Sequence, residues 1–412
     1  MSVLIKPIEE NVAPGDGDGE RKRVLVCVGT YLPGYKAGGP IRSIENLVAA
    51  LGNEIQFQIV TLDRDLGDEA PYRGIKENQW VRVGLADVMY LRPGWLGLLG
   101  TFGLLRSLDQ NTVLYLNSYF SRCFSILPMF MYWLGLCRPR QVVLAPRGEF
   151  SPGALALKKR RKLVYIRLSQ WLGLHNGIIW HASSEFEAVD IRQCYSKLSS
   201  IDVAAVIATA QGIIAPASSV GQRRCKKAGE LRVIFVSRIS RMKNLSSALK
   251  MLDGILGDVL FDIYGPAEDA GYWSECQKLI SALPANVRVE YQGQIEHEKI
   301  GRVFTEHDLF LFPTLGENFG HVICEALLAG CPVLISDQTP WRDLEKRGAG
   351  WAIPLQETER FRSVIQQCVD ADEESYAALA ASAKQYGETV TSAPEIIEAN
   401  RRLFRDASVS RQ

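Results

Sequence analysis

Residues 310–332, FLFPTLGENFGHVICEALLAGCP, contain the clearest structural pattern in the second half of the chain. Residues 310–312 form a short apolar run typical of a buried strand. A loop with two glycines follows, and a helical pattern runs from His321 to Gly330. A strand, a glycine loop and a helix form the repeating unit of parallel α/β sheets, so the stretch predicts an α/β domain.

Two acids stand eight residues apart in this stretch, Glu317 in the loop and Glu325 in the helix. Both are expected near the helix N-terminus, whose free N–H groups and partial positive charge suit an anionic ligand such as a sugar diphosphate. Carboxylates beside such a ligand would repel it unless they accept hydrogen bonds from hydroxyl groups. Taken alone, the two acids are equally consistent with a solvated carboxylate and a helix cap.

A second motif, VSRISRMKNL at residues 236–245, joins a predicted strand, 231–237, to a predicted helix, 244–256, capped by Asn244. Arg238 and Lys243 lie in the intervening loop. Two cations in a loop are usually only solvated. Their place between a strand and a helix favours instead a clamp for a diphosphate, the group that guanidinium and ammonium bind well.

Together, these two motifs resemble the retaining glycosyltransferases of family 4 across about residues 23–405. Segments 145–148 and 181–185 look like the bacterial exopolysaccharide branch of that family. The resemblance implies the α/β GT-B fold, two Rossmann-like doubly wound parallel-sheet domains facing a cleft.

The resemblance also implies roles for single residues of the second half. Arg238 and Lys243 would bind the donor diphosphate, and Glu325 the ribose. Glu317 would be the catalytic residue beside the donor sugar. The remaining residues of the donor sugar and phosphate loop are Asn318, Phe319 and Gly320. No DxD motif accompanies them, so we expect neither a metal nor another cofactor, and the leaving phosphate itself can take the acceptor proton.

The expected cleft and acceptor side lies in the first half. Gly38 and Gly39 precede a predicted helix, 41–51, while Asn117 and Arg147 follow the predicted strands 112–116 and 141–144. Such strand ends are where open α/β sheets bind ligands. A glycine pair alone is more often a turn. Many relatives place a histidine here and this chain does not, so the group that meets the acceptor stays open.

Other stretches have simpler interpretations. His181 is interpreted as a histidine packed within a strand, and Ser184 begins a helix with acids in its first turn. Relatives follow the last first-half strand with Asn-Gly, whereas this chain has Ala210-Gln211-Gly212 and keeps only the glycine. The further predicted strands are 23–29, 56–62, 87–91, 178–181, 203–209, 260–266, 287–293 and 332–336.

At 412 residues the chain predicts two domains. We expect a flexible segment at 1–20, an acceptor-binding domain at 21–215 and a linker at 216–228. A nucleotide-sugar-binding domain at 229–390 and a helix crossing back to the first domain at 391–412 follow.

A net charge of +1 and the absence of zinc-binding Cys/His spacing argue against nucleic acid as a partner. Nine cysteines without a CxxC motif indicate a reducing compartment. The N-terminus lacks the apolar core of a signal peptide, so we expect a cytoplasmic protein, either free or at the inner face of the membrane.

Two stretches have membrane-like composition. Residues 123–137 are apolar all round but shorter than the roughly twenty residues that span a bilayer. Residues 154–174 combine the basic run Lys158 to Lys162 with Trp171, as in a helix lying on an anionic membrane. A buried helix and a solvated charged face are the alternatives.

The predicted activity is transfer of a sugar from a UDP- or GDP-sugar to a glycan or lipid-linked glycan acceptor in exopolysaccharide or cell-surface polysaccharide synthesis. A nucleotide-sugar epimerase of similar architecture and a binding protein without catalysis are the alternatives. The two motifs keep all four of their charged residues, Arg238, Lys243, Glu317 and Glu325. Their presence argues against a binding protein that has lost catalysis.

Overall fold

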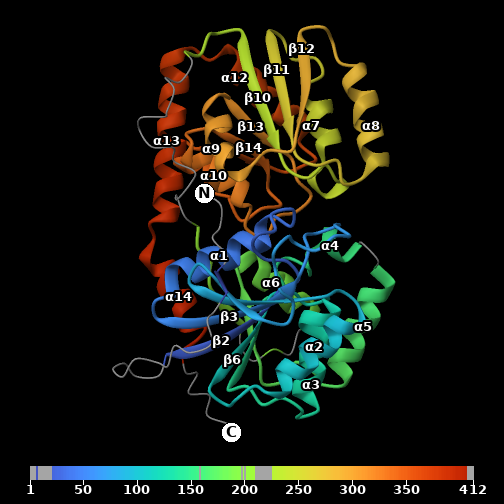
Figure 1. The fold of residues 1–412 in the computed structure, drawn as a ribbon. Coiled ribbons are helices and arrows are strands. Elements are labelled where there is room, and N and C mark those ends of the chain that lie inside the picture. Colours follow the sequence, from blue (N-terminus) through green and yellow to red (C-terminus); the bar gives the residue numbers. More distant parts are fainter. Residues whose placement is uncertain are drawn as a thin grey trace. The chain divides into compact units, whose positions relative to one another are not determined.

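The computed structural model describes residues 6–7, 21–156, 159–195, 198, 201–208 and 225–405. The chain divides into two compact units, one made of residues 1–207 and 394–412 and the other of residues 208–393 (Figure 1). Helix α14, Pro394–Arg402, thus belongs to the first unit. Lys158, Ala210 to Gly212 and most of the expected linker lie outside the described residues.

The first unit is built on a nine-stranded sheet with the order β1-β4-β5-β3-β2-β6-β7-β8-β9. Its strands are β1 Lys6–Pro7, β2 Lys22–Cys27, β3 Ile55–Leu62, β4 Trp80–Val83, β5 Ala86–Leu91, β6 Thr112–Leu116, β7 Gln141–Leu144, β8 Ile179–Ala182 and β9 Ile201–Val203. The parallel neighbours β2 and β6 form the switch point of this sheet, because successive strands are added outward on one side of β2 and then on the other side, beginning with β6.

One edge of this sheet departs from the expected parallel arrangement. Strand β4 pairs antiparallel with β5, and β1 pairs antiparallel with β4. The remaining pairings are parallel. Residues 6–7 were expected to be flexible, and their pairing with β4 differs from that expectation. The sheet is therefore mixed at this edge.

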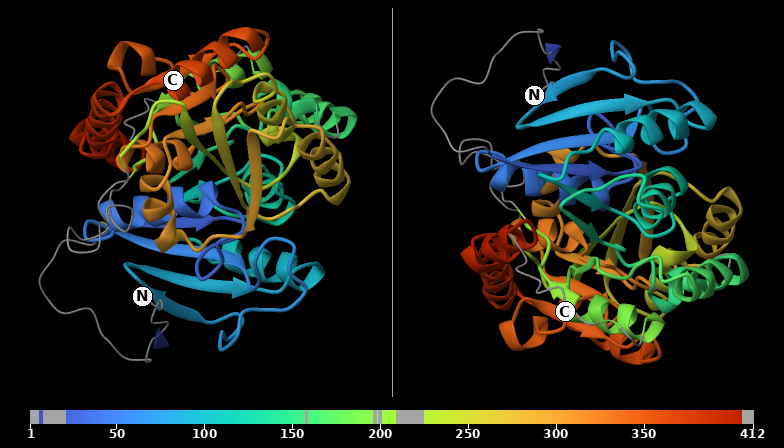
Figure 2. Two further views of the ribbon diagram at one scale, coloured as in Figure 1. Left: turned by 90° about the horizontal axis from the view of Figure 1, so that it is seen from above. Right: turned by 90° about the horizontal axis from the view of Figure 1, so that it is seen from below.

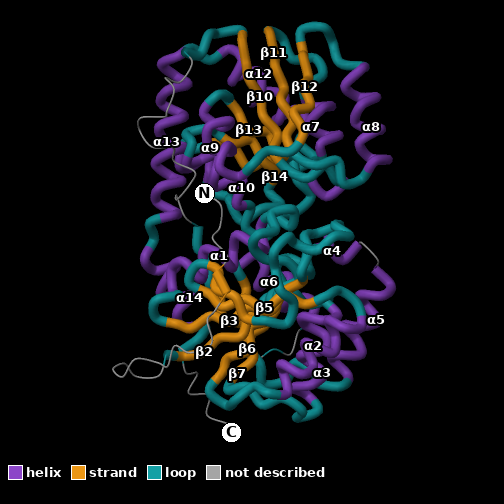
Figure 3. Tube along the Cα trace, viewed as in Figure 1, coloured by secondary structure: helices purple, strands orange, loops and turns teal. Residues whose placement is uncertain are grey.

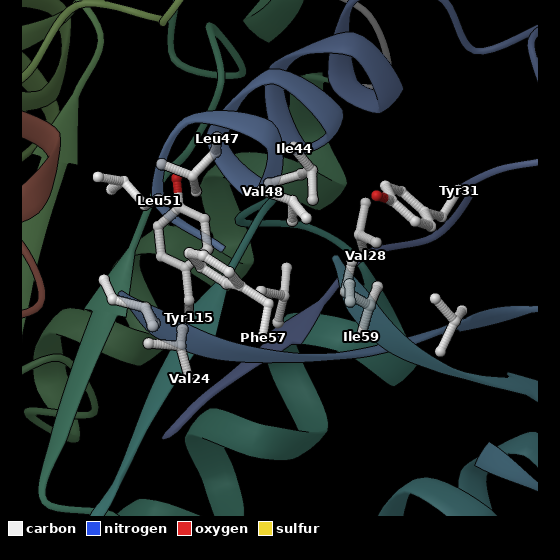
Figure 4. Packing of buried hydrophobic residues seen from close by; sticks show 14 of the residues in the cluster. Val24, Val28, Tyr31, Ile44, Leu47, Val48, Leu51, Phe57, Ile59 and Tyr115 are labelled. Carbon is white, nitrogen blue, oxygen red and sulfur yellow. The ribbon is translucent and has the colours of Figure 1, made fainter. Parts of the chain in front are cut away.

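Alternate residues of β2 enter two separate cores, as expected for a strand covered on both faces. Val24 and Val26 pack with α1, Gly39–Leu51, and with residues beside α14. Figure 4 shows Ile44, Leu47, Val48 and Leu51 packed over the sheet. Leu25 and Cys27 enter the opposite core. The helices that contribute buried residues there are α2 Trp95–Arg106, α3 Leu127–Trp133, α5 Lys159–Trp171 and α6 Glu185–Cys194.

The predicted strand at 203–209 is wrong over the described residues, because β9 ends at Val203. Beyond Val203, side-chain amides donate hydrogen bonds to the backbone carbonyls. Asn400 Nδ2 donates to the Ala205 carbonyl at 2.7 Å, and Asn46 Nδ2 donates to the Ile207 carbonyl at 2.9 Å. These carbonyls therefore find partners on helices instead of on a neighbouring strand.

The second unit has six parallel strands in the order β12-β11-β10-β13-β14-β15. This is the doubly wound order, in which the first and fourth strands of the unit are neighbours and the later strands are added outward on opposite sides of them. The bounds are β10 Glu230–Val236, β11 Asp258–Tyr264, β12 Val287–Gly293, β13 Leu309–Phe312, β14 Val333–Ser336 and β15 Gly350–Ile353.

Helices cover both faces of the second sheet (Figures 2 and 3). Helix α7 packs against α8 and α12, whereas α10 packs against α9 and α13. Their bounds are α7 Leu245–Met251, α8 Ala270–Ser281, α9 His297–Thr305, α10 His321–Leu328, α12 Thr358–Asp370 and α13 Glu373–Thr391, with the short α11 at Leu344–Arg347. No helix in the described ranges is both long and apolar enough to cross a bilayer.

A buried contact between His307 and Asp262 joins elements of the second unit. His307 Nδ1 lies 2.7 Å from the Val303 carbonyl oxygen, and its Nε2 lies 2.9 Å from the Asp262 carboxylate. Burial alone would raise the pKa of Asp262, but hydrogen bonds from His307 and Gln292 outweigh it and lower that pKa.

Candidate active site

Two loops meet at the carboxyl edge of the second sheet, one after β10 and one after β13. The Leu315 amide donates to the Met242 carbonyl at 2.8 Å, and Thr314 Oγ1 donates to the same oxygen at 3.1 Å. Asn244 Nδ2 donates to the Pro313 carbonyl at 2.9 Å. Strands β10 and β13 are the parallel neighbours at the switch point of the strand order. Doubly wound sheets bind ligands at this point.

Lys243 and Glu317 come together across these two loops. The Lys243 ammonium donates to Glu317 Oε1, and it also lies 5.7 Å from the centre of the Phe312 ring. Their side chains are only 12% and 16% exposed. The loop after β13 is further fixed because the Glu317 amide donates to the Gln338 carbonyl at 3.0 Å.

Arg238, in the loop after β10, forms a two-point ion pair. Its Nη1 donates to the two carboxylate oxygens of Glu268 at 3.1 and 3.0 Å. Arg241, three residues on, is paired with Glu275. Both predicted phosphate ligands, Arg238 and Lys243, thus have carboxylate partners in this structure.

Asn244 does not cap helix α7 with its side chain, contrary to the sequence prediction. It has a positive φ of 58°, and its amide nitrogen binds the neighbouring loop. Asparagine tolerates this left-handed conformation better than most residues. The residue therefore ties the two loops together instead of capping its own helix.

Gly320 precedes α10 with a φ of +79°, a conformation that favours glycine. A Cβ there would lie 2.7 Å from Ile323 Cδ1 and 3.7 Å from Glu317 Cγ, which places Glu317 beside the helix N-terminus. The Phe319 ring packs on Trp341, whose Nε1 donates to the Phe319 carbonyl at 2.5 Å. Asn318 Oδ1 is buried and has no hydrogen-bond partner within the described part of the chain.

Glu325 lies in α10 and is only 6% exposed. Its Oε1 is 3.7 Å from Nδ1 of His297, the first residue of α9. The sequence analysis missed His297. It belongs to no motif, and only the packing of α9 against α10 brings it to Glu325.

Gly38 and Gly39 lie at the start of α1, with Gly38 at the N-cap position and φ of +64°. The loop before them is held by Asp65, a buried residue that the sequence analysis missed. The Asp65 carboxylate accepts from the Tyr35 amide at 2.7 Å and from the Lys36 amide at 3.1 Å. Its place three residues after the predicted strand 56–62 was the available signal.

Asn117 and Arg147 are in direct contact at the carboxyl edge of the first sheet. Arg147 Nε donates to Asn117 Oδ1 at 2.7 Å, and Nη2 donates to the Tyr115 hydroxyl at 2.6 Å. His181 continues the chain of hydrogen bonds. Its Nδ1 is 2.9 Å from the Tyr115 hydroxyl, and its Nε2 is 2.9 Å from the Ala204 carbonyl.

The protonation of His181 follows from these partners. A carbonyl only accepts, so Nε2 carries the proton and Nδ1 accepts from the Tyr115 hydroxyl. Burial lowers the pKa of His181 to about 3, and the nearby Arg147 charge acts in the same direction. The interpretation of His181 as a histidine packed within a strand is confirmed, since it lies in β8 and is buried.

Two acids that the sequence analysis left unassigned, the half-buried Glu149 and the buried Glu187, hold the loops around Arg147. The Glu149 carboxylate accepts from the Tyr119 amide at 2.6 Å and from the Ser118 hydroxyl at 2.9 Å. Burial raises the pKa of Glu149 despite these hydrogen bonds. The Glu187 carboxylate accepts from the Gly148 amide at 2.6 Å. Arg147 itself has a positive φ of 56°, which this anchoring maintains.

Within the described ranges, no group of three or more His, Cys, Asp or Glu side chains is arranged to hold a metal ion.

Residues 222–386 match the family model described as Glycosyl transferases group 1. The curated relatives include an uncharacterized 41.2 kDa protein in the cps region of Klebsiella pneumoniae, 25% identical over 248 residues. Another is the 2-deoxystreptamine N-acetyl-D-glucosaminyltransferase of Niallia circulans, 28% identical over 123 residues. The matches cover 57% and 29% of this chain, and 63% and 31% of the relatives' own lengths.

Among solved structures, Anabaena Alr3699/HepE in complex with UDP and glucose matches with a TM-score of 0.68 at 16% identity, covering 93% of this chain and 98% of that one. Sucrose-phosphate synthase from Thermosynechococcus elongatus matches with a TM-score of 0.69 at 16% identity, covering 94% and 98%. At such identities the similarity establishes the fold. The chain has the GT-B fold, as predicted, and its second unit carries a glycosyltransferase domain.

Proposed function

We propose that the protein is a retaining glycosyltransferase of family 4 that transfers a sugar from a nucleotide-sugar to a lipid-linked glycan during cell-surface or exopolysaccharide synthesis. The observation that carries the proposal is the Lys243–Glu317 contact across the loops after β10 and β13. A cation suited to a diphosphate and a carboxylate suited to sugar hydroxyls are in contact at the switch point of the doubly wound sheet.

The donor is proposed to be a UDP-sugar, with a GDP-sugar as the alternative. The structural relative from Anabaena is described with UDP and with UDP-glucose, which supports the first choice. Arg238, Lys243 and the N-terminus of α10 would offset the diphosphate charge without a metal. Each cation would have to leave or share its present carboxylate partner, Glu268 or Glu317.

Glu317 would orient the donor sugar, with Asn318, Phe319 and Gly320 forming the rest of its loop. Glu325 would hold the ribose hydroxyls. Since His297 lies against Glu325, it would fix the position of that carboxylate. The acceptor would bind on the first unit, near Gly38, Gly39, Asn117 and Arg147. The curated relative from a cps region supports a polysaccharide product.

A lipid-linked acceptor implies work at the inner face of the cytoplasmic membrane, and one surface of the first unit fits this role. Trp133 Nε1 donates to the Leu172 carbonyl at 3.0 Å, which joins α3 to the end of α5. Helix α2 packs on α3 (Figure 1). These helices and the turn after α3 expose large apolar side chains: Trp95, Leu96, Leu99, Phe130, Trp133, Leu134, Leu136, Val164, Leu168 and Trp171.

Basic residues lie beside this apolar surface. Lys159, Arg160 and Arg161 are exposed on the first turn of α5. Lys162 turns inward instead, since its ammonium donates to the Ala154 carbonyl at 2.7 Å. Apolar side chains beside exposed cations suit an anionic bilayer, so we propose that α2, α3 and α5 form the membrane-docking surface.

The test of the activity is release of free nucleotide from a UDP-sugar that depends on a glycan acceptor. Binding is screened first by thermal shift, because a ligand at a hundredfold excess over its Kd stabilises a protein by about 2.7 kcal/mol. A transferase releases UDP only with acceptor present. Acceptor-independent conversion would indicate the epimerase alternative, and binding without either reaction would indicate a non-catalytic binding protein.

A further inference from the structure

Two contacting side chains of the first unit, Arg147 and Asn117, each carry a buried hydrogen-bond donor without a partner in the described part of the chain. Arg147 Nη1 and Asn117 Nδ2 have no hydrogen-bond acceptor within the described part of the chain. Asn117 is only 4% exposed. A buried donor without a partner costs about 1–3 kcal/mol, so two such donors on contacting side chains call for a partner from outside the chain, either an ordered water or a ligand group.

The donors cannot satisfy themselves by rearranging the network. Asn117 Oδ1 already accepts from Arg147 Nε, so flipping the amide would break that bond. The Tyr115 hydroxyl accepts from Arg147 Nη2 and gives its proton to His181, whose other nitrogen is bound to Ala204. Every acceptor in this chain of hydrogen bonds is therefore in use.

The positive charge of Arg147 also lacks a direct counter-ion. In the described ranges, no carboxylate lies within 4.0 Å of its guanidinium. The two acids that hold the surrounding loops are bound to backbone amides and hydroxyls, Glu149 to the 118–120 loop and Glu187 to Gly148 and Ser183. A guanidinium that lies partly in the protein interior and contacts only neutral groups favours an anion as its next partner.

The position of the pair is that of a ligand site. Asn117 follows β6, and its backbone N–H donates to the Cys27 carbonyl at the end of β2 at 3.0 Å. These two parallel strands form the switch point of the strand order in the first sheet. Open α/β sheets bind ligands at such points, and Arg147 reaches the same edge from the end of β7.

We propose that Arg147 and Asn117 form a subsite for an oxyanion, a phosphate or carboxylate group of the substrate bound by the first unit. Arg147 Nη1 and Asn117 Nδ2 donate to its oxygens. Calling this substrate the acceptor rests on the proposed function; the subsite itself does not. A phosphate would belong to a lipid-linked acceptor, and a carboxylate to an acidic glycan.

His181 provides a local probe that does not depend on catalysis. The chain has five histidines, and two hydrogen bonds link His181 to the Arg147 guanidinium, one from Arg147 Nη2 to the Tyr115 hydroxyl and one from that hydroxyl to His181 Nδ1. In 15N-histidine-labelled protein, its ring signals are assigned with His181→Gln. Inorganic phosphate and glucuronate are then titrated separately at constant ionic strength, with the buried His307 of the second unit as the internal reference.

We expect His181 to shift saturably with at least one anion while His307 stays unchanged. Asn117→Asp keeps the oxygen that binds Arg147 Nε but replaces the free donor with an acceptor, so it abolishes the shift, and Arg147→Gln does the same. Arg138→Gln, which removes an exposed arginine of the same unit, leaves the shift intact.

No His181 response to either anion overturns the proposal, as does a response that survives both Asn117→Asp and Arg147→Gln. A response to phosphate alone identifies a phosphate group, and a response to glucuronate alone identifies a carboxylate. If wild-type protein transfers sugar while His181 is silent, the subsite fails and the proposed function stands. If His181 responds to an anion as expected while the wild-type protein transfers no sugar, the subsite stands and the transferase proposal fails.

Discussion

Replacing Lys243 with alanine should weaken nucleotide binding, because its ammonium is the most buried cation at the proposed diphosphate site. Its side chain is 12% exposed, so bulk water screens it little. A charged hydrogen bond contributes about 1.5–3 kcal/mol, which at about 1.4 kcal/mol per tenfold corresponds to roughly a 10- to 140-fold rise in Kd for UDP. Isothermal titration calorimetry with UDP measures this change directly.

A matched control lies in the same turn. Arg241 carries the same charge two residues earlier, but its guanidinium is paired with Glu275 on α8 and is 59% exposed. Arg241→Ala should therefore change the Kd by less than about threefold, the effect of an exposed ion pair. An equal rise in the Kd for UDP in Lys243→Ala and Arg241→Ala would mean that only the net positive charge of the loop matters. An unchanged Kd in Lys243→Ala would refute the diphosphate assignment.

Glu317→Gln completes this set of variants. The carboxamide removes the charge that now holds Lys243, so UDP should bind as tightly as in the wild type or more tightly. Weaker binding would mean that Glu317 itself contacts the nucleotide.

Three further predictions concern catalysis, the membrane and pH. Glu325→Gln should mainly raise the KM for the donor and Glu317→Gln should mainly lower kcat, since ground-state and transition-state contacts separate in this way; identical steady-state signatures would contradict the assigned roles. Replacing Lys159, Arg160 and Arg161 with glutamine should remove about 3 kcal/mol of attraction to acidic vesicles in co-sedimentation, at about 1 kcal/mol per charge. The matched triple variant of Lys278, Lys299 and Arg302, exposed in the second unit, should sediment like the wild type, and equal sedimentation of both variants would argue against this docking surface. The folded-state pKa of Asp262 is lowered, so its contribution to stability is full above the unfolded pKa of about 3.9 and is lost as the pH falls through the folded value. Urea unfolding should show a gap between wild type and Asp262→Asn at pH 7 that narrows below pH 4; a gap independent of pH would exclude this linkage.

The buried parallel strands could be predicted because their apolar runs are continuous and end at glycine or polar residues. Strand β12 has the predicted bounds, 287–293, and β6 has the predicted bounds, 112–116. Since the carboxyl ends of parallel strands share an edge, the loops of Lys243 and Glu317 could be placed at one edge from the sequence.

Helix α2 was missed because Gly97, Gly100 and Gly103 contradict helix propensity. The structure explains two of these glycines. A Cβ on Gly97 would lie 2.1 Å from the Arg92 carbonyl oxygen, and one on Gly100 would lie 3.0 Å from Leu91 Cδ2. The helix therefore packs too close to the end of β5 for larger residues, a constraint that no local pattern contains.

Pairings between distant residues could not be predicted either. The contact of His297 with Glu325 and the binding of Asn244 to the Pro313 carbonyl depend on how two elements pack, not on spacing within one. The partnerless donors of Asn117 and Arg147 are likewise visible only once the rest of their network is placed.

The return of α14 to the first unit has a consequence for folding during synthesis. Phe404, just beyond α14, packs edge-on against Phe57 and Tyr115 in the first core, and Asn400 binds the Ala205 carbonyl. Residues 208–393 leave the ribosome before any of these contacts can form. The second unit can therefore fold first, although it is encoded later, while the core between α1 and the first sheet still lacks Leu403 and Phe404.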